Sequence, residues 1–319
     1  MATANQLKML VKSHFEDNNE RFNTLALQIA AHEARLGHTN LANDIRKIIE
    51  SSKNNKPRLK SIDSNLQGLF LEIYPQERLS DLVVAPQIKE RIERIIHEFT
   101  YKDKLFKHNL ENRRKIMFSG NPGTGKTMTA SIIANELKLP IYVVLMDKIV
   151  TKYMGETSAK LRQIFDFIED VPAVYLFDEF DAIGGQRGKD NEVGEMRRVL
   201  NSFLQFIERD HSDSLIIAAT NNLELLDQAL FRRFDDVIHY QLPTDNEKIQ
   251  LLKNRLNGNL SKKEIKELLP ELDSLSHAEI NQACLDVIKT SVIYDLPIRF
   301  DLVVKTIKER KSAYKLSAE

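Results

Sequence analysis

The sequence has one cysteine and no excess of charge. Cys284 cannot form a disulfide within the chain, and the apolar periodicity around it indicates a small core residue rather than a reactive thiol. The 46 basic and 46 acidic residues give a formal net charge of zero at pH 7. A neutral chain has no overall attraction to nucleic acid or to acidic membranes, so no nucleic-acid partner is expected.

Long apolar runs, targeting signals and protease motifs are also missing. No stretch approaches about 18 consecutive apolar residues, and the first six residues lack a basic-then-apolar signal pattern. These absences predict a cytoplasmic chain without membrane insertion. The His-Glu pairs at 32–33 and 97–98 lack the second histidine of a zinc-protease H-E-x-x-H motif. Any proteolysis would therefore come from a separate chain.

The sequence pattern divides the chain into four regions. Residues 1–52 carry three apolar stripes at helical spacing, which predict a small helical bundle. Residues 53–75 begin with a polar, basic, proline-containing stretch and are assigned to a linker. Residues 76–243 alternate short apolar runs with helical stretches, which is typical of a doubly wound α/β unit with a parallel sheet. Residues 244–319 contain only helical patterns and predict a second, all-helical unit.

A glycine-rich segment between a strand pattern and a helix pattern fits the phosphate-binding motif G-x-x-x-x-G-K-[ST]. Its glycines let backbone N–H groups face phosphate oxygens, Lys126 reaches the β- and γ-phosphates, and Thr127 offers a hydroxyl to Mg²⁺. We therefore predict that the chain binds ATP or ADP together with Mg²⁺. The predicted phosphate loop comprises Gly120, Asn121, Pro122, Gly123, Thr124, Gly125, Lys126, Thr127 and Met128.

Two acids follow an apolar strand pattern about fifty residues after the phosphate loop. Asp178 suits Mg²⁺ binding beside Thr127, and Glu179 suits a general base for the attacking water. Alone, this pattern also fits a buried strand that ends in exposed acids. Its distance from the phosphate loop favours the catalytic interpretation.

Together the two motifs resemble the Walker A and Walker B motifs of the AAA subgroup of AAA+ ATPases, and the resemblance extends over about residues 76–312. It implies a P-loop α/β subdomain with a doubly wound parallel sheet, followed by a small helical lid. The resemblance also implies Mg²⁺-dependent ATP hydrolysis and assembly into a homo-oligomeric ring, a hexamer in the family. Residues 1–52 would then be an N-terminal domain that recruits a substrate or partner.

Two further segments resemble other catalytic parts of the family. Asn221 occupies the position of sensor 1, the polar residue that orients the lytic water. Arg232 and Arg233 resemble the arginines that reach a neighbouring subunit's γ-phosphate, for which a forked guanidinium is well suited. A solvated or intrachain salt-bridging arginine pair is the alternative. The sequence does not indicate which arginine has the larger part.

Two segments resemble the walls of the adenine pocket. Leu82 and Val83 belong to a segment that resembles the one lining the adenine pocket before the phosphate loop, although Val84-Ala85 replaces the family's usual Gly-Gly. His277 takes the place of glycine in the lid motif. It is a candidate nucleotide contact, and an ordinary histidine at the start of a helix is the alternative.

Tyr153 and Met154 lie between the second predicted strand and the helix that follows it. They resemble pore loop 1, whose aromatic residues grip an extended polypeptide in the ring. A plain surface or core aromatic is the alternative for Tyr153. The glycine-rich, charged segment 183–193 occupies the place of pore loop 2, or is an ordinary surface loop.

These features favour an ATP-driven protein-remodelling machine that threads a polypeptide through a central pore. The alternative is an ATP-gated switch or scaffold that controls a separately encoded partner, such as a protease. A nucleic-acid motor is disfavoured by the neutral charge and by the aromatic residue in the pore position.

Overall fold

The computed structural model describes residues 19–39, 41–45, 68–149, 154–181, 190–222 and 228–315, and the single positions 9, 13, 47 and 66. The chain forms two compact units, Met1–Lys60 and Ser61–Glu319. In the first unit, helix α2 (Asn19–Arg35) buries Ala26, Ile29 and Ala30. Residues 41–45 are helical as well. Most of the rest of the three-helix bundle expected for residues 1–52 lies outside the described residues.

The second unit contains a six-stranded sheet with the order β1-β3-β4-β5-β2-β6. All neighbouring strands are parallel except β1, which pairs antiparallel with β3. Every residue of β4 and β5 is buried, as expected for parallel strands that are covered on both faces. The predicted mixed α/β class with a largely parallel sheet is therefore confirmed. The strands are β1 (Phe70–Ile73), β2 (Lys115–Gly120), β3 (Ile141–Val144), β4 (Val174–Phe177), β5 (Leu215–Thr220) and β6 (Asp236–Tyr240).

Strand β1 lies within residues 53–75, which the sequence pattern assigned to a linker. Its first residue, Phe70, is buried and packs edge-on against Tyr142, with their ring centroids 5.9 Å apart. Ring packing of this kind adds to the free energy gained by burial. The end of the expected linker is therefore part of the sheet, because Phe70 completes the aromatic core beyond β3.

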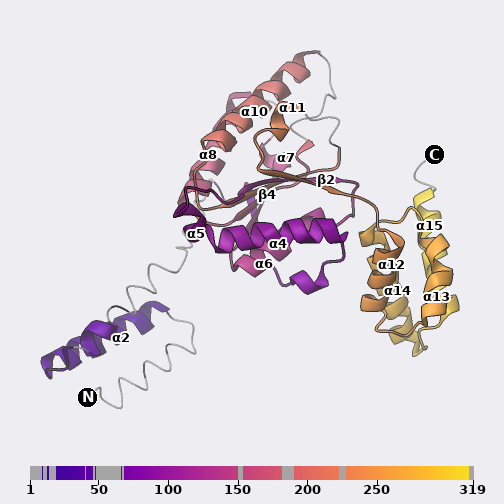
Figure 1. Ribbon diagram of the computed structural model, residues 1–319, viewed down its shortest axis with the longest axis horizontal. Coiled ribbons are helices and arrows are strands. Elements are labelled where there is room, and N and C mark those ends of the chain that lie inside the picture. Colours follow the sequence, from indigo (N-terminus) through magenta and orange to yellow (C-terminus); the bar gives the residue numbers. More distant parts are fainter. Residues whose placement is uncertain are drawn as a thin grey trace. The chain divides into compact units, whose positions relative to one another are not determined.

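Helices cover both faces of the sheet (Figure 1). On one face lie α4 (Pro86–Thr100) and α6 (Lys126–Leu137), which share a buried cluster with Phe118 of β2. On the other face lie α8 (Met154–Asp170) and α10 (Asp190–Arg209), which pack on the adjacent residue Met117. Successive side chains of a strand point to opposite faces, so one apolar strand serves both layers. The shorter helices are α5 (Lys102–Phe106), α7 (Met146–Ile149) and α11 (Gln228–Phe231).

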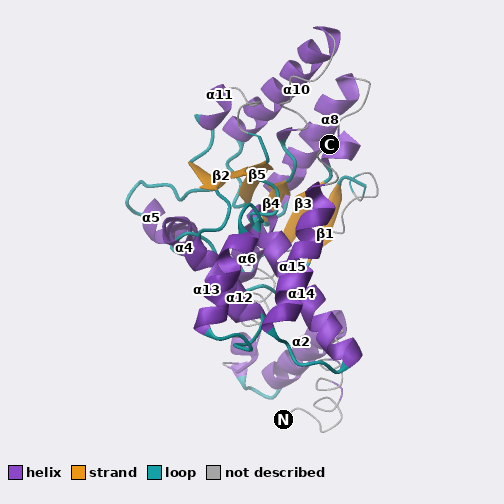
Figure 2. Ribbon diagram, turned by 90° about the vertical axis from the view of Figure 1, so that its right-hand side faces the viewer, coloured by secondary structure: helices purple, strands orange, loops and turns teal. Residues whose placement is uncertain are grey.

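Residues after the sheet form a helical bundle with its own apolar core, which lies beside the sheet in Figure 1 and in the foreground of Figure 2. Its helices α12, α13 and α14 begin with capping boxes at Thr244, Ser261 and Ser276. Cys284 is buried in this core as expected, and burial raises the pKa of its thiol to about 12. The elements are α12 (Asp245–Arg255), α13 (Lys262–Leu268), the 3₁₀ turn η3 (Leu269–Leu272), α14 (His277–Tyr294) and α15 (Phe300–Lys315).

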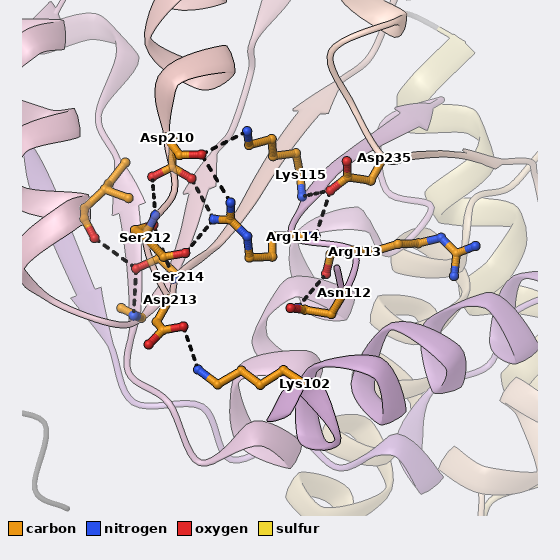
Figure 3. A network of polar contacts seen from close by, with 12 residues as sticks. Lys102, Asn112, Arg113, Arg114, Lys115, Asp210, Ser212, Asp213, Ser214 and Asp235 are labelled. Atoms are coloured by element: carbon orange, nitrogen blue, oxygen red, sulfur yellow. Dashed lines mark hydrogen bonds and ion pairs between the residues drawn. The ribbon is translucent and has the colours of Figure 1, made fainter. Parts of the chain in front are cut away.

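A polar network fixes the start of β2, at the edge of the sheet opposite the phosphate loop (Figure 3). The guanidinium of Arg114 donates to Asp210 Oδ2 at 2.8 Å and to the carbonyl of Ser212 at 2.6 Å. Asp235 Oδ2 accepts the backbone N–H groups of Arg114 and Lys115 at 2.8 and 2.9 Å. These bonds join the start of β2 to the end of α10 and the start of β6. They thereby fix the strand that carries the phosphate loop.

None of the helices in the described part of the chain combines the length and the apolar composition that a bilayer crossing requires.

Candidate active site

The phosphate loop connects β2 to α6 and depends on two close backbone approaches. A Cβ atom on Gly120 would lie 2.1 Å from the carbonyl oxygen of Tyr240 on β6. A Cβ atom on Gly123 would lie 2.6 Å from the hydroxyl of Ser276. Both glycines also have positive φ angles, 139° and 73°. Only glycine allows both the close contacts and the positive φ angles without strain. The contacts with Tyr240 and Ser276 place the loop between the sheet and the lid.

Lys126 is buried at the start of α6, inside the loop. Its Nζ donates to the carbonyls of Gly120 at 2.7 Å and Asn121 at 3.0 Å, and to Asn221 Oδ1 at 2.9 Å. Burial lowers the pKa of Lys126, and the nearby carboxylates of Asp178 and Asp181 oppose that shift. The structure thus brings the predicted phosphate-binding lysine into direct contact with the predicted sensor 1 residue.

The predicted Mg²⁺ ligands also lie together. Thr127 Oγ1 donates to Asp178 Oδ2 at 2.7 Å, across 51 residues of sequence. A hydroxyl beside a carboxylate supplies the oxygen ligands that Mg²⁺ prefers, with phosphates and water completing its shell. These two residues therefore fit a Mg²⁺ ion that is bound together with a nucleotide.

Glu179 follows Asp178 in an unusual backbone conformation. Its φ angle is 51°, in the left-handed region that non-glycine residues adopt uncommonly. The conformation is held because Glu179 N donates to Asp178 Oδ1 at 2.9 Å and Phe180 N donates to the Ala219 carbonyl at 2.8 Å. Glu179 is exposed and lines the cavity beside the phosphate loop. Such strain is concentrated at functional sites, where the surrounding structure maintains it.

A cavity of about 830 Å³ opens between the phosphate loop and the lid. That volume is within the usual range for small-molecule sites. The cavity joins the acids at the end of β4 with Leu82 and Val83 and with His277 at the start of α14. All three predicted base-pocket residues therefore face the same space as the phosphate loop.

The sequence analysis missed several residues at this site, and Asp181 and Asn281 are the two with a clear structural position. Asp181 Oδ1 accepts from Thr220 Oγ1 at 3.1 Å and from Asn221 N at 3.2 Å, so it positions the sensor strand. Asn281 lines the cavity one helical turn after His277. The four-residue spacing on a predicted helix was the available signal for Asn281.

The two arginines lie away from the cavity. In the register of β6 with β2, Tyr240 pairs with Gly120 of the phosphate loop, while Asp236 pairs with Ile116 at the other end of β2. Four residue steps along a strand cover roughly 13 Å. Arg232 and Arg233 precede Asp236, at the edge of the sheet opposite the phosphate loop.

The arginines also differ from each other. Arg233 Nε donates to Glu208 Oε1 at 2.6 Å on α10. Arg232 is exposed, and within the described residues it has no hydrogen-bond or ion-pair partner.

The predicted pore residues cannot be placed in the same way. Tyr153 lies outside the described residues, as does most of segment 183–193. Met154 is the first residue of α8.

Comparisons with known proteins agree with this geometry. A sequence model of the ATPase family associated with various cellular activities (AAA) matches residues 116–242. An uncharacterized AAA family ATPase from Sinorhizobium fredii is 33% identical over 303 residues, which cover 92% of this chain and 90% of that protein. The chain belongs to the AAA family of ATPases. As a AAA ATPase it binds nucleotide and hydrolyses ATP, so the predicted family and enzyme class are confirmed.

Other relatives of this AAA chain bear more specific names. A proteasome-activating nucleotidase from Methanoregula boonei is 29% identical over 71% of this chain and 54% of its own length. A putative 26S proteasome regulatory subunit homolog from Methanothermobacter thermautotrophicus is 35% identical over 44% of this chain and 38% of its own length. The chain therefore spans about half the length of the first and less of the second.

The position of Lys126 inside the phosphate loop predicts the effect of removing its side chain from this AAA site. Lys126→Ala should weaken ATP binding by about 10- to 100-fold, because charge-assisted hydrogen bonds to phosphate oxygens are lost. Titration calorimetry of the wild type and the variant measures this loss. Lys104→Ala is the matched control, since Lys104 is exposed on α5 and does not line the cavity. Equal affinities for Lys126→Ala and wild type would contradict the assignment.

Proposed function

We propose that this AAA ATPase is a protein-remodelling machine that works as a homo-oligomeric ring, a hexamer, in the cytoplasm. The observation that carries the proposal is the separation of the arginines from the chain's own phosphate loop. An exposed Arg232 at the opposite edge of the sheet supports a site that a second copy completes. A contact between two different surfaces of identical chains repeats head to tail, and it gives a ring when the rotation closes.

The predicted catalytic and nucleotide-binding residues then have the following chemical roles. The amides of the phosphate loop and Lys126 bind the phosphates, and Thr127 and Asp178 hold Mg²⁺. The bound ion supplies charge neutralisation at the phosphates. Glu179 takes a proton from the attacking water, and Asn221 orients that water. Arg232 of a neighbouring copy stabilises the charge that develops on the transferred phosphate.

The relatives' names support a protein substrate. Two of them are named as a proteasome-activating nucleotidase and a proteasome regulatory subunit homolog. By analogy, the chain acts on a polypeptide, and residues 1–52 recruit it. Any proteolysis of the polypeptide would come from a separately encoded chain.

The grip on the polypeptide is assigned to Tyr153, and this assignment can be tested. Tyr153→Ala should leave nucleotide affinity and ring assembly intact, because the family resemblance assigns Tyr153 to the pore loop and not to the nucleotide-binding residues. It should remove substrate-stimulated ATPase activity and the threading of a tagged client, since the aromatic face that packs on the polypeptide is gone. Steady-state ATPase assays with and without client, together with a fluorescence unfolding assay, measure both effects.

Tyr153→Phe is the matched control and should be nearly silent, because packing does not need the hydroxyl. Remodelling of the natural client by Tyr153→Ala at the wild-type rate would refute the threading mechanism. The ATP-gated switch would then explain the chain better, because a switch needs no grip on a polypeptide.

A further inference from the structure

Helix α14 begins against the phosphate loop, and residues of its first two turns line the cavity. The N–H of Ala278 donates to the carbonyl of Gly123 at 2.9 Å, which fixes the start of the helix against the loop. An α-helix rises about 1.5 Å per residue, so Asn281 lies about 6 Å further along the axis than His277. Both side chains line the cavity. The helix therefore presents one polar residue near the loop and another a full turn beyond it.

These two side chains contain buried polar atoms without partners. His277 Nδ1, His277 Nε2 and Asn281 Oδ1 are covered by protein, and no described residue forms a hydrogen bond with them. Burial lowers the pKa of His277, and the nearby Glu247 opposes the shift. A buried polar atom without a hydrogen-bond partner lowers the stability of the fold, and most buried polar atoms in folded proteins have a partner. A ligand in the cavity can supply the partners once the side chains turn toward it.

The residues that line the cavity differ in chemistry. Lys126, Thr127 and Asp178 form the phosphate-binding part, and the apolar residues Leu82 and Val83 line the cavity as well. A nucleotide whose phosphates bind the loop must place its nucleoside among the lid residues and these apolar side chains. Ribose adjoins the phosphates, so the base lies further out. Asn281 is therefore at the level of the base, and His277 is nearer the ribose.

We propose that the carboxamide of Asn281 reads the purine base and selects adenine over guanine. An asparagine side chain offers an acceptor, Oδ1, beside a donor, Nδ2, and adenine offers the matching 6-amino donor and N7 acceptor. Guanine presents two acceptors, O6 and N7, along the same edge, so Oδ1 would face O6. The inference rests on nucleotide binding in this cavity and adds a residue that determines its base specificity.

The test compares four diphosphates by titration calorimetry on full-length wild type and Asn281→Leu. The ligands are ADP, GDP, 2′-deoxy-ADP and purine riboside diphosphate, which lacks the 6-amino group. The substitution should weaken ADP about tenfold and bring the ADP-to-GDP affinity ratio close to one. It should weaken 2′-deoxy-ADP by the same factor, and purine riboside diphosphate by less than about threefold.

Two controls separate recognition from folding. Asn254→Leu changes an exposed amide on α12 that lines the same cavity, and it should leave the ADP-to-GDP ratio unchanged. The melting temperature of Asn281→Leu without nucleotide should be unchanged or higher, because an unpaired buried amide oxygen is removed. Equal losses for ADP and purine riboside diphosphate would overturn the proposal, as would a loss that disappears with 2′-deoxy-ADP. Failure of the wild type to bind any of the ligands would instead refute nucleotide binding in this cavity.

Discussion

Replacing Glu179 with glutamine is expected to lower ATP turnover by about 10²- to 10⁴-fold while leaving ATP affinity unchanged. The amide preserves the shape of the side chain but cannot take a proton from water. The backbone around residue 179 should persist, because its φ angle of 51° is held by bonds from the N–H groups of Glu179 and Phe180, and the Glu179 side chain takes no part in them. The change therefore isolates the chemical step from nucleotide binding.

Phosphate-release kinetics measure the turnover, and calorimetry with ATP measures the affinity. Glu77→Gln is the matched control, because Glu77 is an exposed glutamate that lines the same cavity. It removes the same charge and should keep wild-type turnover. A Glu179→Gln variant that hydrolyses ATP at close to the wild-type rate would assign the base to another acid, with Asp178 and Asp181 as the candidates.

Much of the sheet can be predicted from sequence because its strands are buried on both faces. Two of the short apolar runs within residues 76–243, at 173–177 and 215–219, became β4 and β5, which differ from the runs by one residue at one end. A fully buried parallel strand is a continuous apolar run, so its signal is local. Strand β1 gave no such signal. It has four residues, contains the charged Glu72, and exists only through antiparallel pairing with β3 about seventy residues later.

The candidate site likewise has a part that a local sequence pattern predicts and a part that only the folded chain reveals. The phosphate loop is one continuous segment, so its chemistry can be inferred from spacing alone. Asn281 gained meaning only when the start of α14 was placed on Gly123. Likewise, only the folded chain shows Arg233 bound to Glu208 on α10. Long-range contacts of this kind depend on packing that no local pattern encodes.

The arginine pair gives the other large effect. Arg232→Ala should lower ATP turnover by about 10³-fold with unchanged ATP affinity, because an arginine supplied in trans stabilises the transition state and not the bound nucleotide. Arg233→Ala should have a smaller effect on turnover and should lower the melting temperature, since it loses the bond to Glu208. Turnover per subunit should also rise with protein concentration as rings assemble. Equal turnover losses for the two variants with no change in stability would refute this division of roles.

Mixing two inactive variants tests the contribution in trans directly. Glu179→Gln subunits keep their arginines but cannot hydrolyse ATP, and Arg232→Ala subunits keep an intact cavity. In a head-to-tail ring formed from equal amounts, about a quarter of the interfaces pair an intact cavity with an intact Arg232. Activity should therefore reappear on mixing, although each variant alone is inactive.

The double variant Glu179→Gln/Arg232→Ala, mixed with Arg232→Ala, is the control and should restore no activity. If the first mixture stays inactive while light scattering shows mixed rings, Arg232 does not act across the interface. Turnover that is independent of concentration in a monomer would contradict the ring itself.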